Sequence, residues 1–127
     1  LSETLRIKRQ FRESEQALRD AIAEVSQTQA ETWRVMELHR RLGDLLTARS
    51  DFAPALAEYE TAAHGWFDKP SSGRPPEKER LIFVSFISFW KLAAEANSPV
   101  ADEHEQAEWE RRLEEWEAVR PTAASAR

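Results

Sequence analysis

The apolar residues in the first part of the chain repeat with the period of an α-helix. Between residues 4 and 28 they recur alternately three and four positions apart, which places them on one face of a long amphipathic helix. This seam consists of Thr4, Ile7, Phe11, Ser14, Leu18, Ala21 and Val25. No glycine or proline interrupts residues 8–10. The pattern leaves open whether residues 4–28 form one helix or two shorter ones.

Two further helices are predicted on either side of a tight turn. The spacing of Thr28 and Glu31 fits a capping box, so we expect a helix to begin there and to stop before Ser50. Asp51 suits the N-cap position of the next helix, because its carboxylate can accept a hydrogen bond from a free backbone N–H. That helix should end at about Phe67.

The segment 68–78 has the composition of an exposed loop and is the strongest candidate for mobility. The apolar run LIFVSFISFW at residues 81–90 favours a strand by propensity. A lone strand would leave its backbone groups unpaired, so we expect a helix instead. The run is too short to cross a bilayer, which needs roughly twenty residues, so it should be a core element. Within it, Ser85 and Ser88 should form a small-residue stripe that lets another helix approach closely.

A fifth helix is predicted over residues 100–119, after the helix-ending sequence Asn-Ser-Pro. Trp109, Leu113 and Trp116 lie four and three positions apart on one face, and the remaining face is strongly acidic. The whole pattern is that of an all-α protein. A chain of 127 residues with 41% hydrophobic content can bury one core, so we expect a single domain. The domain should cover residues 1–120, followed by a flexible tail at 121–127.

Residues 36–69 resemble one unit of the tetratricopeptide repeat family, which is a helical hairpin. The matching residues are His39, Leu42, Gly43, Leu46, Ala55, Tyr59 and Ala62. Gly43 and Ala55 would let the two helices cross closely. His39 stands where the family has an aromatic residue, and Phe67 stands where it has a closing proline. The resemblance implies antiparallel helical hairpins in a right-handed stack of about five helices.

Weaker copies of this unit flank it at irregular spacings. One copy lies 41 positions earlier, at Ser2, Leu5, Phe11, Ser14, Leu18 and Ala21. It would need a turn at residues 8–10, so it competes with one uninterrupted helix. Another copy lies 45 positions later, at Ile87, Ser88, Val100, His104 and Ala107. Both offsets exceed the family period of about 34, so the chain is either a piece of a longer array or a compact variant.

The resemblance also implies that a partner lies along the groove formed by the first helix of each hairpin. Glu37, Arg40, Asp44 and Thr47 would be exposed there. Family members that grip a C-terminal carboxylate use asparagine together with lysine or arginine. Asp44 stands where the key asparagine would fall, which argues against a carboxylate clamp. A groove of mixed charge fits a basic or mixed peptide instead.

Five tryptophans are more than a small domain requires for its core. We expect Trp33 and Trp90 to be core residues. Trp66, Trp109 and Trp116 are candidates for partner binding, because tryptophan is enriched at the energetic centres of interfaces. The alternative is that these side chains only pack the last helix onto the others.

Charge and residue content disfavour several function classes. The 18 basic and 23 acidic residues give a net charge of -5, so no broad positive field attracts nucleic acid or an anionic membrane. The absence of cysteine excludes disulfides and fits a cytoplasmic protein, and no signal peptide is recognisable. His39, His64 and His104 fall on separate predicted helices, without the paired histidines of a helical metal site. No nucleophile-elbow, phosphate-loop or dinucleotide pattern occurs, so we expect no catalytic residue, metal or cofactor.

The leading prediction is a non-catalytic protein–protein interaction module or scaffold of tetratricopeptide type, within a larger bacterial-looking regulatory protein. A second prediction is a self-association domain, in which the seam of residues 4–28 and the stripe from Trp109 to Trp116 pair with copies of themselves. A third prediction is a small-ligand pocket beside residues 81–90, which only the abundance of aromatic residues supports.

Overall fold

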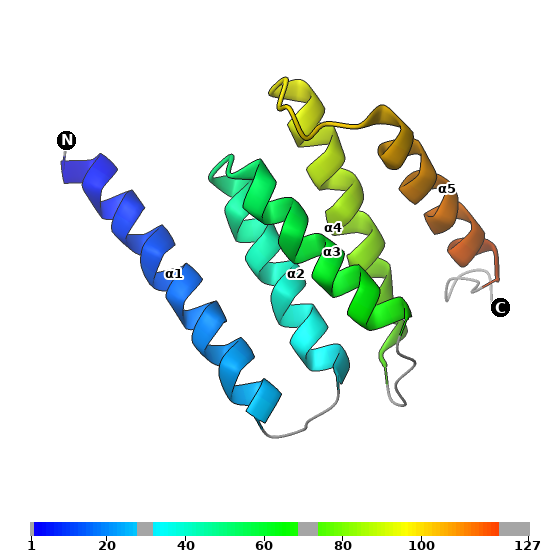
Figure 1. Cartoon of the computed structure of the whole chain (residues 1–127), viewed down its shortest axis with the longest axis horizontal. Helices are drawn as coiled ribbons and strands as arrows, with labels where there is room; N and C mark the ends of the chain where they lie inside the picture. Colours follow the sequence, from blue (N-terminus) through cyan, green and yellow to red (C-terminus); the bar gives the residue numbers. More distant parts are fainter. Residues whose placement is uncertain (1, 28–31, 69–73, 120–127) are drawn as a thin grey trace, which may run out of the picture.

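The computed structural model describes residues 2–27, 32–68 and 74–119, which form five α-helices (Figure 1). The helices are α1 (Ser2–Gln27), α2 (Thr32–Ala48), α3 (Phe52–Phe67), α4 (Pro76–Glu95) and α5 (Glu103–Val119). Consecutive helices run antiparallel, and no β-strand occurs in the described ranges. The all-α prediction is confirmed, including the helix over residues 81–90.

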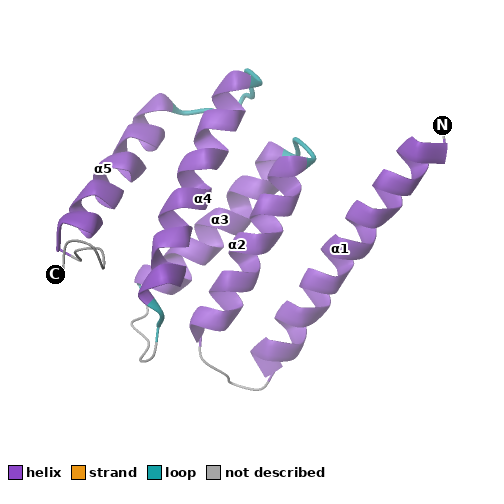
Figure 2. Cartoon of the chain, turned by 180° about the vertical axis from the view of Figure 1, so that it is seen from behind, coloured by secondary structure: helices purple, strands orange, loops and turns teal. Residues whose placement is uncertain are grey.

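Helices α2 and α4 hold the other helices together (Figure 1 and Figure 2). α2 packs against α1, α3 and α4, while α4 packs against α2, α3 and α5. We call α2–α3 the first hairpin and α4–α5 the second. The second hairpin therefore lies, through α4, against both helices of the first. The backbones of α3 and α5 stay more than 8 Å apart at every Cα pair, so only side chains can bridge them. None of the described helices is apolar over a stretch long enough for a membrane crossing.

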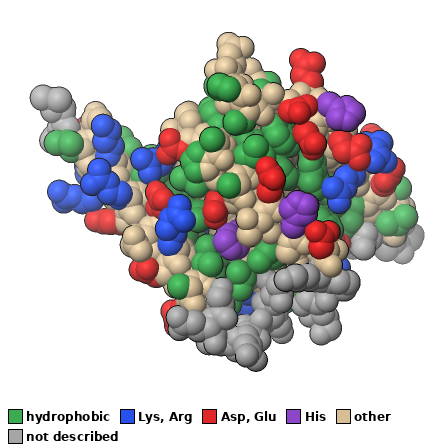
Figure 3. Space-filling model, in the orientation of Figure 1, with side chains coloured by type: hydrophobic (Ala, Val, Ile, Leu, Met, Phe, Trp, Pro, Cys, Tyr) green, Lys and Arg blue, Asp and Glu red, His purple; other side chains and the backbone are tan. Residues whose placement is uncertain are grey.

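Helix α1 is uninterrupted over 26 residues. The turn at residues 8–10 that an upstream repeat copy requires is therefore ruled out. The second half of the helix packs against the core through Leu18 and Ile22. The first half is exposed, with Leu5 66% and Ile7 44% accessible to solvent. Basic side chains gather at this end, seen in blue at the left of Figure 3. They are Arg6, Lys8, Arg9 and Arg12.

The same backbone turn follows α2 and α4. Ser50 and Asn97, which lie 47 positions apart, have positive φ angles of 63° and 54°. In each turn the next residue donates its N–H to the carbonyl five residues earlier, at 2.9 Å. This bonding pattern satisfies helix-end carbonyls that would otherwise have no partner. The turn thus repeats at an offset of 47, two positions more than the offset of 45 at which the sequence predicts a further copy.

The offset of 47 pairs Gly43 of the first hairpin with Trp90 of the second. A Cβ atom added at Gly43 would lie 2.9 Å from the ring of Tyr59, so α2 and α3 cross closely. Trp90 places a large indole at the matching position, and the backbones of α4 and α5 contact each other less than those of α2 and α3. The predicted small-residue stripe is also wrong, because Ser85 is buried whereas Ser88 is exposed.

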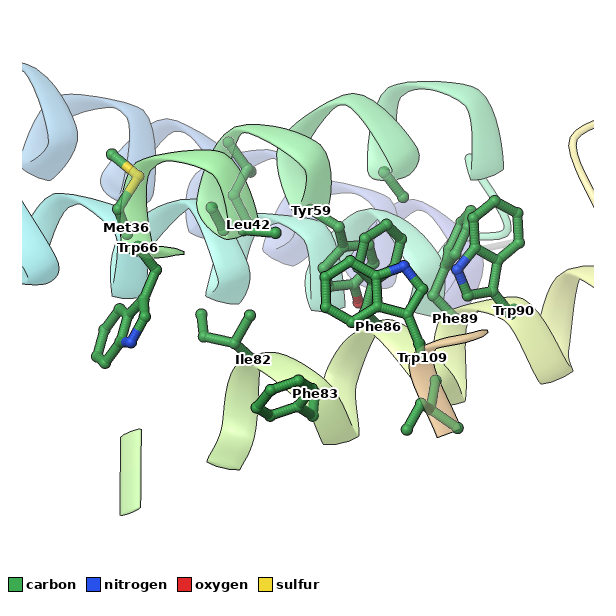
Figure 4. Packing of buried hydrophobic residues seen from close by; sticks show 14 of the residues in the cluster. Met36, Leu42, Tyr59, Trp66, Ile82, Phe83, Phe86, Phe89, Trp90 and Trp109 are labelled. Atoms are coloured by element: carbon green, nitrogen blue, oxygen red, sulfur yellow. The ribbon is translucent and has the colours of Figure 1, made fainter. Parts of the chain in front are cut away.

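An aromatic cluster fills the space between the two hairpins (Figure 4). Tyr59 of α3 stacks on Phe86 of α4, with ring centroids 5.4 Å apart. Phe86 in turn stacks on Trp90 at 5.5 Å and contacts Trp109 of α5 at 4.7 Å. Such offset ring pairs stabilise a core beyond the burial of their surface. The cluster therefore links three helices through one central ring.

Two predicted helix starts are corrected by the structure. α4 begins at Pro76, inside the segment expected to be a loop, because the first helical position needs no N–H donor. α5 begins at Glu103 rather than near residue 100, because the carboxylate of Asp102 accepts the N–H of His104 at 2.9 Å. Asp51 does occupy the N-cap position of α3, although its side chain makes no capping hydrogen bond.

Several predicted features lie outside the described residues. They are the capping box at residues 28–31, residues 69–73 of the segment expected to be a loop, and the tail at 121–127.

Replacing Gly43 with alanine should destabilise the protein, although alanine favours helices by about 1 kcal/mol. The new methyl group would press on the buried ring of Tyr59, and overpacking of this kind costs about 1–3 kcal/mol. Gly65→Ala is the control, because its Cβ would meet the flexible side chain of Met36, which can change rotamer. Urea unfolding should therefore show the larger loss for Gly43→Ala. Equal losses in the two variants would contradict the close crossing of α2 and α3.

Candidate functional site

The four residues predicted to line a partner groove form a buried polar network centred on Arg40. Its guanidinium donates to both carboxylate oxygens of Glu37, at 2.9 and 2.6 Å. It also donates to Asp44 at 2.8 Å and to Ser85 of α4 at 3.0 Å. The hydroxyl of Tyr59 donates to the other oxygen of Asp44 at 2.6 Å. The network therefore joins α2 to both α3 and α4.

The predicted exposure is wrong for Glu37, Arg40 and Thr47, whereas the side chain of Asp44 is partly exposed. Glu37, Arg40 and Thr47 are each only 8% accessible, and Asp44 is half-buried. The cause is α4, which lies against this face of α2 and brings Ser85 onto the guanidinium. The polar groups consequently bond to one another and present little surface to a partner.

The charge states of the network are held by its own contacts. Burial alone would raise the pKa of Glu37, but the hydrogen bonds and charge of Arg40 lower it below its ordinary value of 4.5. The ammonium of Lys78, 3.5 Å away, acts in the same direction. Burial raises the pKa of Tyr59, and the neighbouring carboxylate of Asp44 raises it further. Near neutral pH, Glu37 is therefore ionised and Tyr59 is neutral.

Two of the tryptophans predicted to bind a partner share one buried carboxylate. Trp66 donates its indole N–H to one oxygen of Glu79 at 3.0 Å, and Trp116 donates to the other oxygen at 2.6 Å. Trp66 has no exposed surface and Trp109 is 7% exposed, so neither forms an open patch. These contacts pack α5 onto the other helices, which is the alternative that the sequence left open.

The two tryptophans expected in the core differ in burial. Trp90 is 4% exposed, as predicted. Trp33 is half-buried and contacts Trp66 edge-on, with ring centroids 6.2 Å apart.

The histidines occupy three unrelated environments. His39 of α2 is half-buried and lies 2.9 Å from a carboxylate oxygen of Glu58 on α3. His64 is exposed and pairs with Asp68 at 3.0 Å. His104 is exposed near the start of α5. In the described part of the chain, no three histidine or carboxylate side chains come together in a group that could hold a metal ion.

A pocket of about 380 Å³ opens between α3 and α5, beside the part of α4 that carries Phe86 and Trp90. It exists because the backbones of α3 and α5 stay apart while α4 fills only part of the gap. Its apolar wall consists of Leu56, Ala63, Phe67, Phe86, Trp90 and Trp109. The pocket lies beside residues 81–90, where the sequence predicted a small-ligand site, although ligand binding itself stays a prediction.

Charged side chains form the remainder of the pocket wall. They are Glu60, His64, Asp68, Glu105, Glu108 and Arg112. Glu108 pairs with Arg111, and Asp68 pairs with His64. Arg112 lies over the ring of Trp109, 4.2 Å from its centroid. Figure 3 shows this face, where acidic side chains and histidines lie among exposed hydrophobic atoms.

Two carboxylates and one indole of this pocket have unused hydrogen-bonding capacity. Within the described residues, Glu60 and Glu105 form no ion pair, although both are exposed at the pocket. The Nε1 atom of Trp90 is buried and has no hydrogen-bond partner in the described structure. An unsatisfied buried donor costs about 1–3 kcal/mol, so it is uncommon in a folded protein.

The pocket residues escaped sequence reasoning because they come from separate helices. The strongly acidic face of α5 was visible in the sequence, but the matching carboxylate of Glu60 on α3 was not distinguished from an ordinary surface residue. The signal that could have found the site was Trp90, aligned with Gly43 at the turn-to-turn offset of 47. A large residue in place of a small one indicates that α4 and α5 cross less closely than α2 and α3.

No model of a known protein family matches the chain, and neither a curated protein nor a solved structure matches it.

Replacing Arg40 with methionine should lower the free energy of unfolding by about 3–5 kcal/mol, because Glu37 would keep a buried charge without its main partner. Arg41→Met is the matched control on the next position, where the side chain is exposed. Its effect should stay within about 0.5 kcal/mol. Chemical unfolding of both variants measures the difference. Similar losses would show that the network does not stabilise the fold.

The lowered pKa of Glu37 should appear in the acid stability of the protein. The unfolded chain takes up this proton more readily than the folded one, so the stability is present above pH 4.5 and is lost as the pH falls through the lower folded pKa. Glu37→Gln should therefore show a shallower decline of unfolding free energy below that pH. Glu24→Gln, at an exposed position of α1, should keep the wild-type slope. An unchanged slope in Glu37→Gln would refute this account.

Proposed function

We propose that the chain is a non-catalytic module that binds a protein or peptide partner and is built from stacked helical hairpins of the tetratricopeptide type. The observation that supports this proposal is the recurrence of one hydrogen-bonded turn after α2 and after α4. The packing of α4 on both α2 and α3 adds to it. Stacked-hairpin proteins use such contacts to build a continuous core and an extended binding face.

The residues that carry the family resemblance support the same proposal through their packing. Gly43 lies against the ring of Tyr59, and Ala55 is fully buried on the facing helix. Small residues at these two positions allow the close crossing that a hairpin unit requires. His39, which replaces the family's aromatic residue, still links the two helices through Glu58.

The distribution of polar groups favours binding over catalysis. The groups around Arg40 are bonded to one another, and their charge states are held by those bonds. The carboxylates of Glu60 and Glu105 instead lie where a ligand can reach them. A pocket with an aromatic wall and a few placed polar groups is typical of recognition sites. We place this module in a larger cytoplasmic regulatory or scaffold protein; the lack of cysteine fits only the reducing compartment in this proposal.

Selection from a random-peptide display library against the full chain tests this function. We expect repeated selection to enrich one family of related peptides, whose synthetic members bind the folded chain saturably. The urea-unfolded chain is the control bait and should enrich none of them, because the binding face depends on the stacked helices. Failure to enrich any family specific to the folded chain would refute the proposed function.

A further inference from the structure

The pocket between α3 and α5 combines a buried donor without a partner and carboxylates without partners. Trp90 is 4% exposed, and its Nε1 has no hydrogen-bond partner within the described residues. In Figure 4 the ring edge that carries this atom faces Trp109, on the α5 side of the pocket. A buried donor without a partner gains a hydrogen bond if an acceptor reaches it from the pocket that Trp90 lines.

The charges around the pocket favour a cationic ligand. Glu60 on α3 and Glu105 on α5 have no ion pair in the described structure, and they stand on opposite walls. The basic groups of the wall are already engaged, because Arg112 stacks on Trp109 and His64 pairs with Asp68. The wall therefore carries more negative than positive charge, although the guanidinium of Arg112 makes ring contacts rather than an ion pair in the described structure.

The aromatic wall selects among cations. The guanidinium of Arg112 already lies 4.2 Å from the centroid of Trp109 and 5.3 Å from that of Phe67. Such stacking is favoured for arginine, whose planar group is more weakly hydrated than an ammonium. The volume of about 380 Å³ lies at the small end of ligand pockets, which suits one long side chain with its adjoining backbone.

We propose that this pocket binds an arginine side chain of a basic peptide segment, an inference that rests on the proposed peptide-binding function. The guanidinium lies between Glu60 and Glu105, and its stem packs on Phe86 and Trp109. A backbone carbonyl of the peptide accepts the N–H of Trp90. Because Nε1 itself has almost no accessible surface, this bond requires a small rotation of the neighbouring rings. The partner site is thus on the α3–α5 face rather than over the Arg40 network.

The first test compares two end-blocked peptides, Leu-Arg-Leu-Arg-Leu and the same peptide with citrulline in place of arginine. Citrulline keeps the shape of arginine and removes its charge. Calorimetric titration of the full chain should show binding of the arginine peptide that is about tenfold tighter than that of the citrulline peptide, as expected for two partly exposed ion pairs. Equal affinities would overturn the proposal.

The second test changes the carboxylates of the protein. Glu60→Gln combined with Glu105→Gln should reduce the arginine preference to less than about twofold. Glu103→Gln combined with Glu114→Gln removes the same charge from exposed positions outside the pocket, and it should preserve the preference. Circular dichroism verifies that both variants fold. Loss of the preference in both variants, or in neither, would refute the assignment of these carboxylates.

The third test follows the indole N–H of Trp90 by NMR. Its signal is identified by its loss in Trp90→Phe, and the arginine peptide should shift it. Binding without a shift of this signal would place the peptide elsewhere.

The library selection separates this inference from the proposed function. A peptide family that lacks arginine, or that binds the variant with Glu60→Gln and Glu105→Gln unchanged, would leave the proposed function in place and overturn the pocket assignment. Absence of any enriched family, together with no binding of the arginine peptide, would overturn both.

Discussion

One buried guanidinium fixes how the two hairpins sit together. Arg40 is held within α2 by Glu37 and Asp44, and a further N–H of its guanidinium donates to Ser85 of α4. A buried charge that loses a partner destabilises a fold far more than the complete pair stabilises it, so the network favours one placement of α4. The positions of Phe86 and the other aromatic residues of α4 follow from that placement.

The two hairpins share a turn but differ in how closely their helices cross. After α2, the turn is followed by a crossing in which Gly43 touches the ring of Tyr59. After α4, the same turn precedes a crossing in which Trp90 stands at the matching position. Repeat symmetry in the backbone is therefore combined with asymmetry in the side chains. The asymmetry produces the cavity, because the indole of Trp90 needs more space between two helices than the hydrogen atom of Gly43.

The helices were predictable from sequence because their apolar spacing, capping residues and prolines are local signals. The burial of Glu37 and Arg40 was not, since it depends on Ser85, which lies 45 positions away from Arg40 and reaches it only through the fold. The alternation of apolar and polar residues alone predicts that charged side chains lie at the protein surface. The pocket was hidden for the same reason, because its carboxylates, such as Glu60, come from helices whose relative position no local signal records.

The paired indole bonds of Glu79 have a mechanical consequence for that pocket. They close the space between α3, α4 and α5 at one end, through Trp66 and Trp116. At the other end, the turn at Asn97 joins α4 to α5 and is closed by its own hydrogen bonds. A cavity whose walls are joined in this way loses little conformational entropy when it is filled. Its width is therefore set by the fold before any ligand arrives.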